Sequence, residues 1–441
     1  MTKTKRMVSF MAAAVLLLSG CTKTAATEGN SAGGNAASNG SSGDKIVLTV
    51  ATSDPTQQNL FDSMGIEKRF QELYPNVTFE FEKFQESGEF ENAMKIRASS
   101  KSLPDIMFFK PTALSTFGEY LAPLDELEAA KNNLYAAEYK VAGSIRGIPA
   151  TSSREFVYYW KSIFTECGLE VPTTWDNFVK AAETIKEKRP DLAPIAMGGK
   201  DEWPDYPFNE YMPALEAKDG QLWNAMAAED QPFGKDTPFN KSYQKIFDLF
   251  QAGVLGPDPQ GIGFDQARAM FSSQQAGMIA AGSWIYGDLS KEAPDKIDDL
   301  GAFYLPTRES ASDEFVTISQ ADEFLAVSQS SANREMAKNF ANFYSSENWY
   351  PEYIQQMSYL PTVKDVTVTL EKPMNEAVLA QKDVKIILYD GGNEDFNNIV
   401  TEIKFNYKKL GAEMMTPGFD LEKRLEELNA QWKEAREKLG K

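Results

Sequence analysis

Histidine is absent from all 441 residues. This absence excludes Ser-His-Asp and Cys-His nucleophile pairs, and it excludes every metal site built on imidazole. Only two cysteines are present, so no thiolate cluster is available for zinc. The phosphate-cradling Gly-Lys-Ser/Thr loop is also missing, and Gly261-Ile262-Gly263 lacks the third glycine of a dinucleotide fingerprint. We therefore expect no metal and no cofactor, while carboxylate chemistry such as glycoside hydrolysis stays open.

The chain has fewer positively charged than negatively charged residues. The chain carries 45 Lys and Arg against 64 Asp and Glu, giving a formal net charge of −19. A surface of this sign repels phosphate backbones, so we expect no nucleic-acid partner. Polyanionic ligands are disfavoured for the same reason.

Long apolar runs are lacking as well, and the most apolar one lies near the N-terminus. Residues 7–18 are apolar but fall short of the roughly 20 residues that span a bilayer. Positively charged residues precede this run, and Leu18-Ser19-Gly20-Cys21 closes it. The order resembles the bacterial lipobox. It implies a signal peptide over residues 1–20 and a lipid on Cys21 that anchors the protein to the outer face of the plasma membrane. An ordinary signal peptide followed by a chance cysteine is the alternative.

The segment after Cys21 is rich in small and polar residues. Residues 22–43 hold too little apolar surface to offset the entropy of ordering, so we expect residues 21–43 to form the lipidated cysteine and a flexible linker. The remainder, 44–441, is long enough for two lobes with separate cores. If Cys21 carries lipid, Cys167 is left without a disulfide partner, and we expect it to be a small buried residue.

Apolar runs and helical patterns alternate in the first part of this domain. Strands are predicted over 46–51, 77–82 and 106–109. A helix with apolar positions from Phe61 to Leu73 and a second helix over 90–98 lie between them. This strand–helix order predicts an α/β lobe with a mostly parallel sheet.

The rest of the chain continues the same mixture. Strands are predicted over 156–160, 276–281 and 325–327. Helices are predicted from a capping box at Thr173 and Asp176, over 334–344, and over 421–439. The last helix is rich in opposite charges, and we expect it to pack on the outside of a lobe.

Aromatic and polar side chains stand together where several predicted strands end. Ligands of open α/β sheets bind at the carboxyl ends of strands. There, a flat ring can cover the apolar face of a pyranose, and carboxylates can accept hydrogen bonds from its hydroxyls. Trp284 stands out, because Gly282 and Ser283 would leave its indole little cover. The candidate ligand-binding residues on these grounds are Asp54, Phe109, Lys110, Tyr159, Glu202, Trp203, Trp284, Asp322 and Glu323.

Several short segments, in their order and spacing, resemble the family 1 extracellular solute-binding proteins of sugar importers, which are similar to maltose-binding protein. The resemblance covers nearly all of the chain after the linker. It rests on Leu103-Pro104-Asp105-Ile106-Met107, Gly147-Ile148-Pro149, Tyr158-Tyr159-Trp160-Lys161, Gly168-Leu169, Pro172-Thr173-Thr174-Trp175-Asp176, Ala276 to Trp284 and Tyr359-Leu360-Pro361-Thr362.

The resemblance implies an α/β fold of the periplasmic-binding-protein type II kind. Each of two lobes would be a mixed, mostly parallel sheet flanked by helices, with hinge crossovers and a helical C-terminus. Lobe 1 would comprise about 44–152 and 314–355, and lobe 2 about 153–313 and 356–441. The implied activity is capture of a sugar by hinge closure and its delivery to the permease subunits of an ABC importer. We expect a monomer and no enzymatic turnover.

The resemblance also suggests roles for single residues. Trp284 would stack on a sugar ring, Glu202 and Trp203 would form part of the pocket wall, and Tyr159 would face the cleft near the hinge. Phe109 and Lys110 would lie in the loop after the third strand, and Asp390 to Phe396, with Asp395 and Phe396 as ligand-binding residues, would approach from the last helical region.

Two departures from the family pattern leave the ligand open. Trp160 stands where the family usually has asparagine, and Ala321-Asp322-Glu323 replaces a glycine-rich stretch. The alternatives are a binding protein for a polyamine, a peptide or an iron chelate, a carboxylate-based glycoside hydrolase, and a sensory partner of a membrane kinase.

Overall fold

The structure is a computed structural model that describes residues 45–84 and 87–441. The predicted signal peptide, Cys21 and the linker lie outside the described residues. Among those described, no helix combines the length and the apolar character that crossing a bilayer requires.

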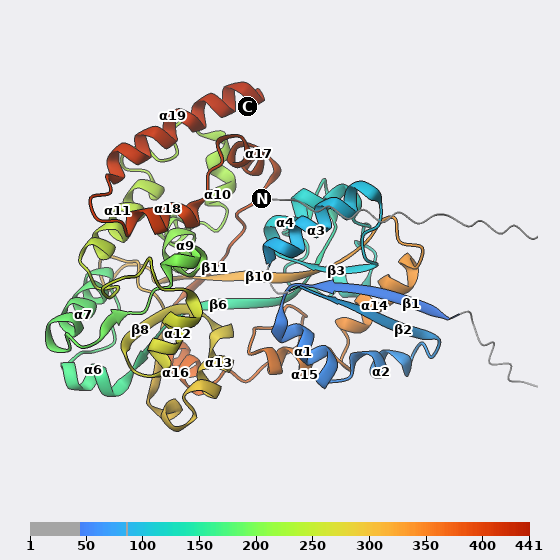
Figure 1. Ribbon diagram of the computed structural model, residues 1–441, viewed down its shortest axis with the longest axis horizontal. Helices are drawn as coiled ribbons and strands as arrows, with labels where there is room; N and C mark the ends of the chain where they lie inside the picture. Colours follow the sequence, from blue (N-terminus) through green and yellow to red (C-terminus); the bar gives the residue numbers. More distant parts are fainter. Residues whose placement is uncertain (1–44, 85–86) are drawn as a thin grey trace, which may run out of the picture. The chain divides into compact units, whose positions relative to one another are not determined.

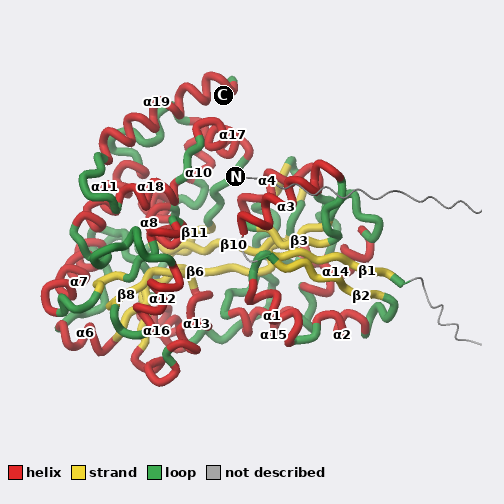
Figure 2. Tube along the Cα trace, viewed as in Figure 1, coloured by secondary structure: helices red, strands yellow, loops and turns green. Residues whose placement is uncertain are grey.

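Nine strands of the described chain form one mixed sheet (Figures 1 and 2). Its order is β2-β1-β3-β10-β6-β8-β7, with β11 paired to β10 and β9 paired to β6, while β4 and β5 form a separate pair. The strands are β1 (Ile46–Thr52), β2 (Val77–Lys83), β3 (Ile106–Phe109), β4 (Lys140–Val141), β5 (Ser144–Ile145), β6 (Ile148–Trp160), β7 (Ala193–Ile195), β8 (Ala276–Gly282), β9 (Leu300–Phe303), β10 (Val316–Val327) and β11 (Lys385–Leu388).

Helices flank this sheet on both sides (Figure 2). They are α1 (Pro55–Ser63), α2 (Ile66–Gln71), α3 (Ser87–Ser100), α4 (Pro111–Phe117), α5 (Glu128–Lys131), α6 (Lys161–Cys167), α7 (Trp175–Lys188), α8 (Tyr206–Asn209), α9 (Tyr211–Ala217), α10 (Leu222–Ala225), α11 (Pro238–Gln251), α12 (Phe264–Ser272), α13 (Tyr286–Glu292), α14 (Arg334–Tyr344), α15 (Tyr350–Met357), α16 (Lys372–Ala380), α17 (Glu394–Ile403), α18 (Tyr407–Met414) and α19 (Leu421–Leu439).

Lobe 1 is built on the parallel strands β2, β1 and β3, and the innermost of these, β3, is buried on both faces. Alternate residues of β3 show how: Ile106 and Phe108 enter one core, and Met107 and Phe109 enter another on the opposite face. A strand covered on both faces is apolar throughout, which is why its sequence shows no alternation. Helices α1, α14 and α15 contribute to the first of these cores, and α3 and α4 to the second.

Lobe 2 has a single larger core around β6, β7, β8 and β9. The last helix, α19, belongs to it, because Leu425, Leu428 and Trp432 are buried there while its charged residues face outward. Cys167 is buried in the same core and is unpaired.

Two long strands, β6 and β10, run antiparallel to each other and pass through both lobes (Figure 1). The N-terminal part of β10 packs in the lobe 2 core through Val316 and Ile318, and its C-terminal part packs in lobe 1 through Phe324 and Leu325. The chain therefore changes lobes inside regular strands. After α15, Met357 and Val363 still pack in lobe 1, and Leu370 is the first residue to rejoin lobe 2.

Most predicted elements are confirmed, with three corrections. The helix predicted across Phe61 to Leu73 is two helices, because Gly65 adopts a left-handed conformation (φ 65°) that interrupts α1 and α2. The helix predicted to be capped at Thr173 is capped by Thr174, whose side chain accepts from the backbone of Asn177. The strands predicted over 156–160 and 325–327 are only the ends of β6 and β10.

Candidate functional site

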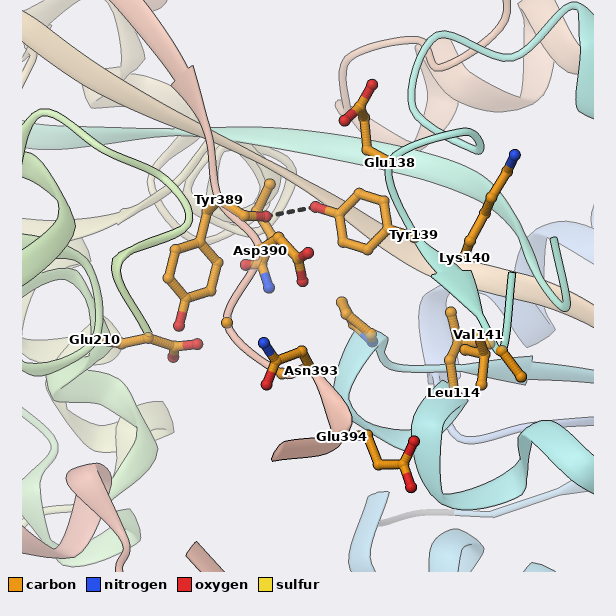
Figure 3. A pocket seen from close by; sticks show the side chains of 15 residues that line it. Leu114, Glu138, Tyr139, Lys140, Val141, Glu210, Tyr389, Asp390, Asn393 and Glu394 are labelled. Atoms are coloured by element: carbon orange, nitrogen blue, oxygen red, sulfur yellow. Dashed lines mark hydrogen bonds between the residues drawn. The ribbon is translucent and has the colours of Figure 1, made fainter. Parts of the chain in front are cut away.

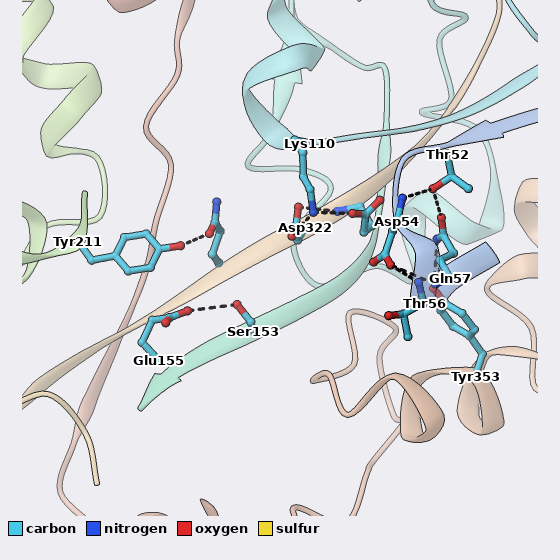
Figure 4. A network of polar contacts seen from close by, with 12 residues as sticks. Thr52, Asp54, Thr56, Gln57, Lys110, Ser153, Glu155, Tyr211, Asp322 and Tyr353 are labelled. Carbon is cyan, nitrogen blue, oxygen red and sulfur yellow. Dashed lines mark hydrogen bonds and ion pairs between the residues drawn. The ribbon is translucent and has the colours of Figure 1, made fainter. Parts of the chain in front are cut away.

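A polar network occupies the sheet surface where β6 and β10 cross between the lobes (Figure 4). Lys110 follows β3, and its Nζ lies 2.9 Å from Asp322 Oδ2 and 2.5 Å from Glu323 Oε1. The lysine side chain keeps 37% of its surface exposed, whereas Glu323 keeps 1%. Glu323 also has a positive φ of 50°, a strained backbone that commonly marks functional sites. The end of one strand thus presents an ammonium to two carboxylates on another.

The charges of this network hold each other in place. Burial alone would lower the pKa of Lys110, but the carboxylates of Asp322 and Glu323 raise it well above its ordinary value. Burial raises the pKa of Glu323, and the ammonium of Lys110 opposes that shift. Lys110 therefore stays charged at neutral pH.

Asp54 borders the same network from the start of α1. Its carboxylate caps the helix by accepting from the backbone N–H of Thr56 at 2.7 Å and of Gln57 at 3.2 Å. The Gln57 side chain is buried and hydrogen-bonds to Thr52, Tyr344 and Tyr353. The carboxyl ends of β1 and β3 therefore converge on β10, as ligand sites of open sheets do.

Lobe 2 carries four half-buried aromatic residues, Trp203, Tyr206, Phe264 and Trp284, which lie close together and which we call the aromatic wall. The ring of Trp203 lies 4.5 Å from that of Phe264 and 6.1 Å from that of Trp284, centroid to centroid. Trp203 and Trp284 follow β7 and β8, which are parallel neighbours, so their carboxyl ends bring the two rings together.

Glu155 joins the aromatic wall to the hinge strand β6. Its Oε2 accepts a hydrogen bond of 2.7 Å from the Tyr206 hydroxyl, whose oxygen accepts from the backbone N–H of Gly282 at 2.9 Å. A side chain at position 282 would collide here, because a Cβ would lie 2.5 Å from Trp284 Nε1 and 3.0 Å from Glu155 Oε1. Glycine at the end of β8 is therefore what allows the indole and the carboxyl group to meet.

A cavity of about 130 Å³ lies beside the network, between the lobes (Figure 3). Leu114, Tyr139 and Val141 line it from lobe 1, and Glu210 and the segment from Tyr389 to Glu394 line it from lobe 2. The Tyr139 hydroxyl donates a hydrogen bond of 2.5 Å to the Tyr389 carbonyl, which joins the two sides.

The cavity wall is acidic and continuous with the network. Burial raises the pKa values of Glu210 and Asp390. Gln320 lines the cavity and accepts a hydrogen bond from Tyr211, and it faces Ser153 across the β10–β6 pair. The polar surface therefore extends from Asp54 in lobe 1 to Trp284 in lobe 2. Within residues 45–84 and 87–441, no three Asp, Glu or Cys side chains converge closely enough to hold a metal ion.

The structure brings six of the predicted site residues into two groups. Asp54, Lys110, Asp322 and Glu323 share the polar network, and Trp203 and Trp284 share the aromatic wall. Glu202 directly precedes the wall and is half-buried, with an unusual φ of 61°.

Four predicted residues lie elsewhere. Phe109 is fully buried and stacks on Phe117, because β3 is covered on both faces. Tyr159 packs on Phe164 in the lobe 2 core and does not face the other lobe. Phe396 is likewise buried in lobe 2, and Asp395 pairs with Lys441 at the surface. These four residues therefore lie outside the polar network and the aromatic wall. Of the segment Asp390 to Phe396, which the resemblance placed near the ligand, residues 390–394 line the cavity, whereas Asp395 and Phe396 do not.

Sequence reasoning missed Glu155, Tyr206, Phe264, Tyr139 and Glu210. Glu155 and Glu210 are single acids among 64, and only their burial sets them apart. Phe264 had a usable signal in the sequence, because it directly follows the glycine-rich segment Gly261-Ile262-Gly263.

Two comparisons of sequence place the chain among known proteins. The family described as bacterial extracellular solute-binding protein matches residues 53–350. A protein from Streptococcus mutans named multiple sugar-binding protein is 26% identical over 261 residues, covering 56% of this chain and 59% of that protein. The Bacillus subtilis melibiose/raffinose/stachyose-binding protein MelE is 25% identical over 165 residues, covering 36% and 37%. The chain thus spans less than two thirds of the length of these relatives.

Solved structures match the fold over most of the chain. The solute-binding protein RafE in complex with raffinose has a TM-score of 0.74 at 19% identity, covering 89% of this chain and all of that one. A manno-oligosaccharide-specific solute-binding protein from Bifidobacterium animalis subsp. lactis, in complex with mannotriose, also has a TM-score of 0.74, at 18% identity, covering 90% and 96%. At these identities the likeness concerns the fold, and it confirms the two-lobed α/β architecture.

Proposed function

Because this chain belongs to the bacterial extracellular solute-binding protein family, we propose that it captures a neutral sugar or oligosaccharide outside the cell and delivers it to the permease of an ABC importer. The names of its relatives support a sugar as the ligand.

The observation that carries this proposal is the aromatic wall together with the polar network. Trp203 and Trp284 offer indole faces, which suit the apolar C–H face of a pyranose. In lobe 1, the partly exposed Asp322 offers carboxylate oxygens and Lys110 offers an ammonium for the hydroxyls of the same ring. Each lobe supplies only one of these two halves.

That division explains how binding would close the lobes. A ligand that meets both halves has a higher affinity for the closed form, so it shifts the population toward closure. The β6–β10 pair is the hinge in this scheme, because both strands continue through both cores. The Tyr139–Tyr389 hydrogen bond would form on closure, since it links the lobes directly. The permease would then recognise the closed form, and no bond of the sugar would be broken.

A ligand screen tests the proposal. Purified residues 22–441 are expected to unfold at a higher temperature in the presence of neutral oligosaccharides, with raffinose and mannotriose as the first probes. A ligand present at a hundred times its Kd stabilises the fold by about 2.7 kcal/mol. If every carbohydrate of a broad panel leaves the unfolding temperature unchanged, the proposed ligand class is wrong.

The acidic cavity favours a polyamine as the second candidate ligand. Glu138, Glu210, Asp390 and Glu394 all line it, against the single cation Lys140. Putrescine and spermidine therefore belong in the same screen, and stabilisation by them but not by sugars would select this alternative.

Long incubation with the bound oligosaccharide should yield no new reducing ends, and their appearance would select a hydrolase.

We also propose that the protein works as a monomer anchored through a lipid on Cys21. Cys21→Ala is expected to move the protein from the membrane fraction into the medium, or to leave it unprocessed, because the thiol that accepts the lipid is lost. Immunoblots of cell fractions measure both outcomes. Cys167→Ala is the matched control and should stay membrane-bound, since Cys167 is buried in lobe 2. A cleaved Cys21→Ala protein that remains in the membrane fraction would rule out this anchor.

A further inference from the structure

Glu155 is a buried acid without a cationic partner. Its side chain is 6% exposed, and it makes no ion pair with any lysine or arginine of the described residues. It lies on the hinge strand β6, directly opposite Gly282 at the end of β8. An ionised carboxylate in this position would be costly, because burial removes it from bulk solvent and no opposite charge among the described residues balances it.

The hydrogen bonds around Glu155 indicate where its proton resides. The Tyr206 oxygen accepts from the Gly282 backbone N–H, and the Trp284 indole N–H also interacts with it. Both lone pairs of that oxygen are then used, so the Tyr206 hydroxyl donates its hydrogen to Glu155 Oε2. Among the described residues, the Ser153 hydroxyl is the one hydrogen-bond partner of Glu155 Oε1, at 3.5 Å. Oε1 is therefore the oxygen that carries a proton in the neutral acid, and it lies on the side of the Trp284 indole.

On balance, the surroundings of Glu155 favour its neutral form over its ionised form. Burial raises the pKa of Glu155 to about 8, and the nearby carboxylates of Glu210 and Asp322 add to this shift, while the hydroxyls of Tyr206 and Ser153 oppose it. The remaining titratable neighbours are phenols, Tyr158 and Tyr211. The electrostatics thus agree with the hydrogen-bond geometry.

We propose that Glu155 binds the sugar as an un-ionised carboxylic acid and donates its Oε1 proton to an oxygen of the ring stacked on Trp284. The proposal rests on the sugar-binding function argued above and adds a specificity-determining residue to it. A neutral acid offers a donor beside the indole where an ionised one offers only acceptors. This position therefore selects a sugar with an acceptor oxygen, such as an ether or ring oxygen, next to the stacked face.

Affinity measured against pH tests the proposal. The probe is whichever oligosaccharide of the screen stabilises the protein most, and calorimetry gives its Kd from pH 6.5 to 9. If only the un-ionised form binds, about one tenth of the free protein is competent at pH 9, and Kd rises about tenfold. In Glu155→Gln the amide keeps a donor and an acceptor and cannot titrate, so Kd should lie within about threefold of the wild-type value at pH 6.5 and stay constant to pH 9.

The control variants show whether Glu155 itself causes the pH dependence of the affinity. Glu166→Gln changes an exposed acid on α6 and should reproduce the wild-type profile. Glu323 and Glu210 are further buried acids of the site with raised pKa values, and if either were the source of the pH dependence, the slope would persist in Glu155→Gln. That result would overturn the proposal, as would a flat wild-type profile or an affinity that rises with pH. A wild-type protein that binds no sugar at any pH would instead overturn the proposed function itself.

Discussion

Gly220→Ala is expected to lower the free energy of unfolding by about 3 kcal/mol, since it forces atoms into a packed backbone. Gly220 lies in the turn between α9 and α10, where a Cβ would lie 1.7 Å from the Leu388 carbonyl oxygen and 2.5 Å from its carbon. A backbone carbonyl cannot rotate away as a flexible side chain does. Denaturant unfolding measures the loss.

This substitution should also disturb the cavity. The Gly220 carbonyl accepts from the Asp390 backbone N–H at 3.0 Å, so the segment after β11 must move with the turn. Gly287→Ala is the matched control: its Cβ would meet only Ser358 Oγ at 3.8 Å, and alanine within a helix is worth up to about 1 kcal/mol over glycine. We expect Gly287→Ala to be neutral or stabilising. If the free energy of unfolding of Gly220→Ala equalled that of the wild type, the turn would not approach β11 as closely as the structure shows.

Trp284→Ala is expected to weaken sugar binding by about 1–3 kcal/mol, which is a rise in Kd of roughly 5- to 150-fold. The indole is half-buried in the aromatic wall, where it can stack on a ligand and also supports Trp203 and Phe264. Trp284→Phe keeps an aromatic face and should lose less than the alanine variant. Calorimetry gives both affinities.

Folding must be checked alongside, because Trp284 also packs on the lobe 2 core. An unfolding temperature close to the wild-type value without ligand, together with a raised Kd, would locate the defect in binding. An unchanged Kd would remove Trp284 from the site.

The sequence predicted those elements whose hydrophobic pattern and turn residues lie within one short segment. The strands and helices of lobe 1 alternate as their hydrophobic patterns indicate, and Trp284 was found because small residues precede it. Strand β10 was mostly missed, because its middle reads Ser319-Gln320-Ala321-Asp322-Glu323 and such polar residues argue against a buried strand. They are tolerated there because partners come from distant positions, such as Lys110 and Tyr211.

The same reason explains why the sequence also singled out Phe109 and Tyr159, which the structure buries in the lobe cores. Both are aromatic residues in or at the end of strands, as ligand-stacking residues are, and pattern alone cannot tell which face of a strand meets the other lobe. In the structure Met107 and Phe109 share one core, and Tyr159 lies over Gly301 in another. Glu155 was missed for the opposite reason. Nothing in its sequence neighbours or spacing distinguishes it from other acids, and its role becomes apparent only from its contacts with Tyr206, which also binds Gly282.

The way the chain returns to each lobe has a consequence during synthesis. Lobe 1 needs Tyr353 and Met357 to close its core, and lobe 2 needs Trp432 from α19. The lobe 1 core cannot be completed before Met357 has emerged from the ribosome, and the lobe 2 core cannot be completed before Trp432 has emerged, although strands β1–β3 emerge early. Nascent protein therefore stays incompletely folded until these distant residues have been made, with apolar strands that need protection from aggregation in the meantime.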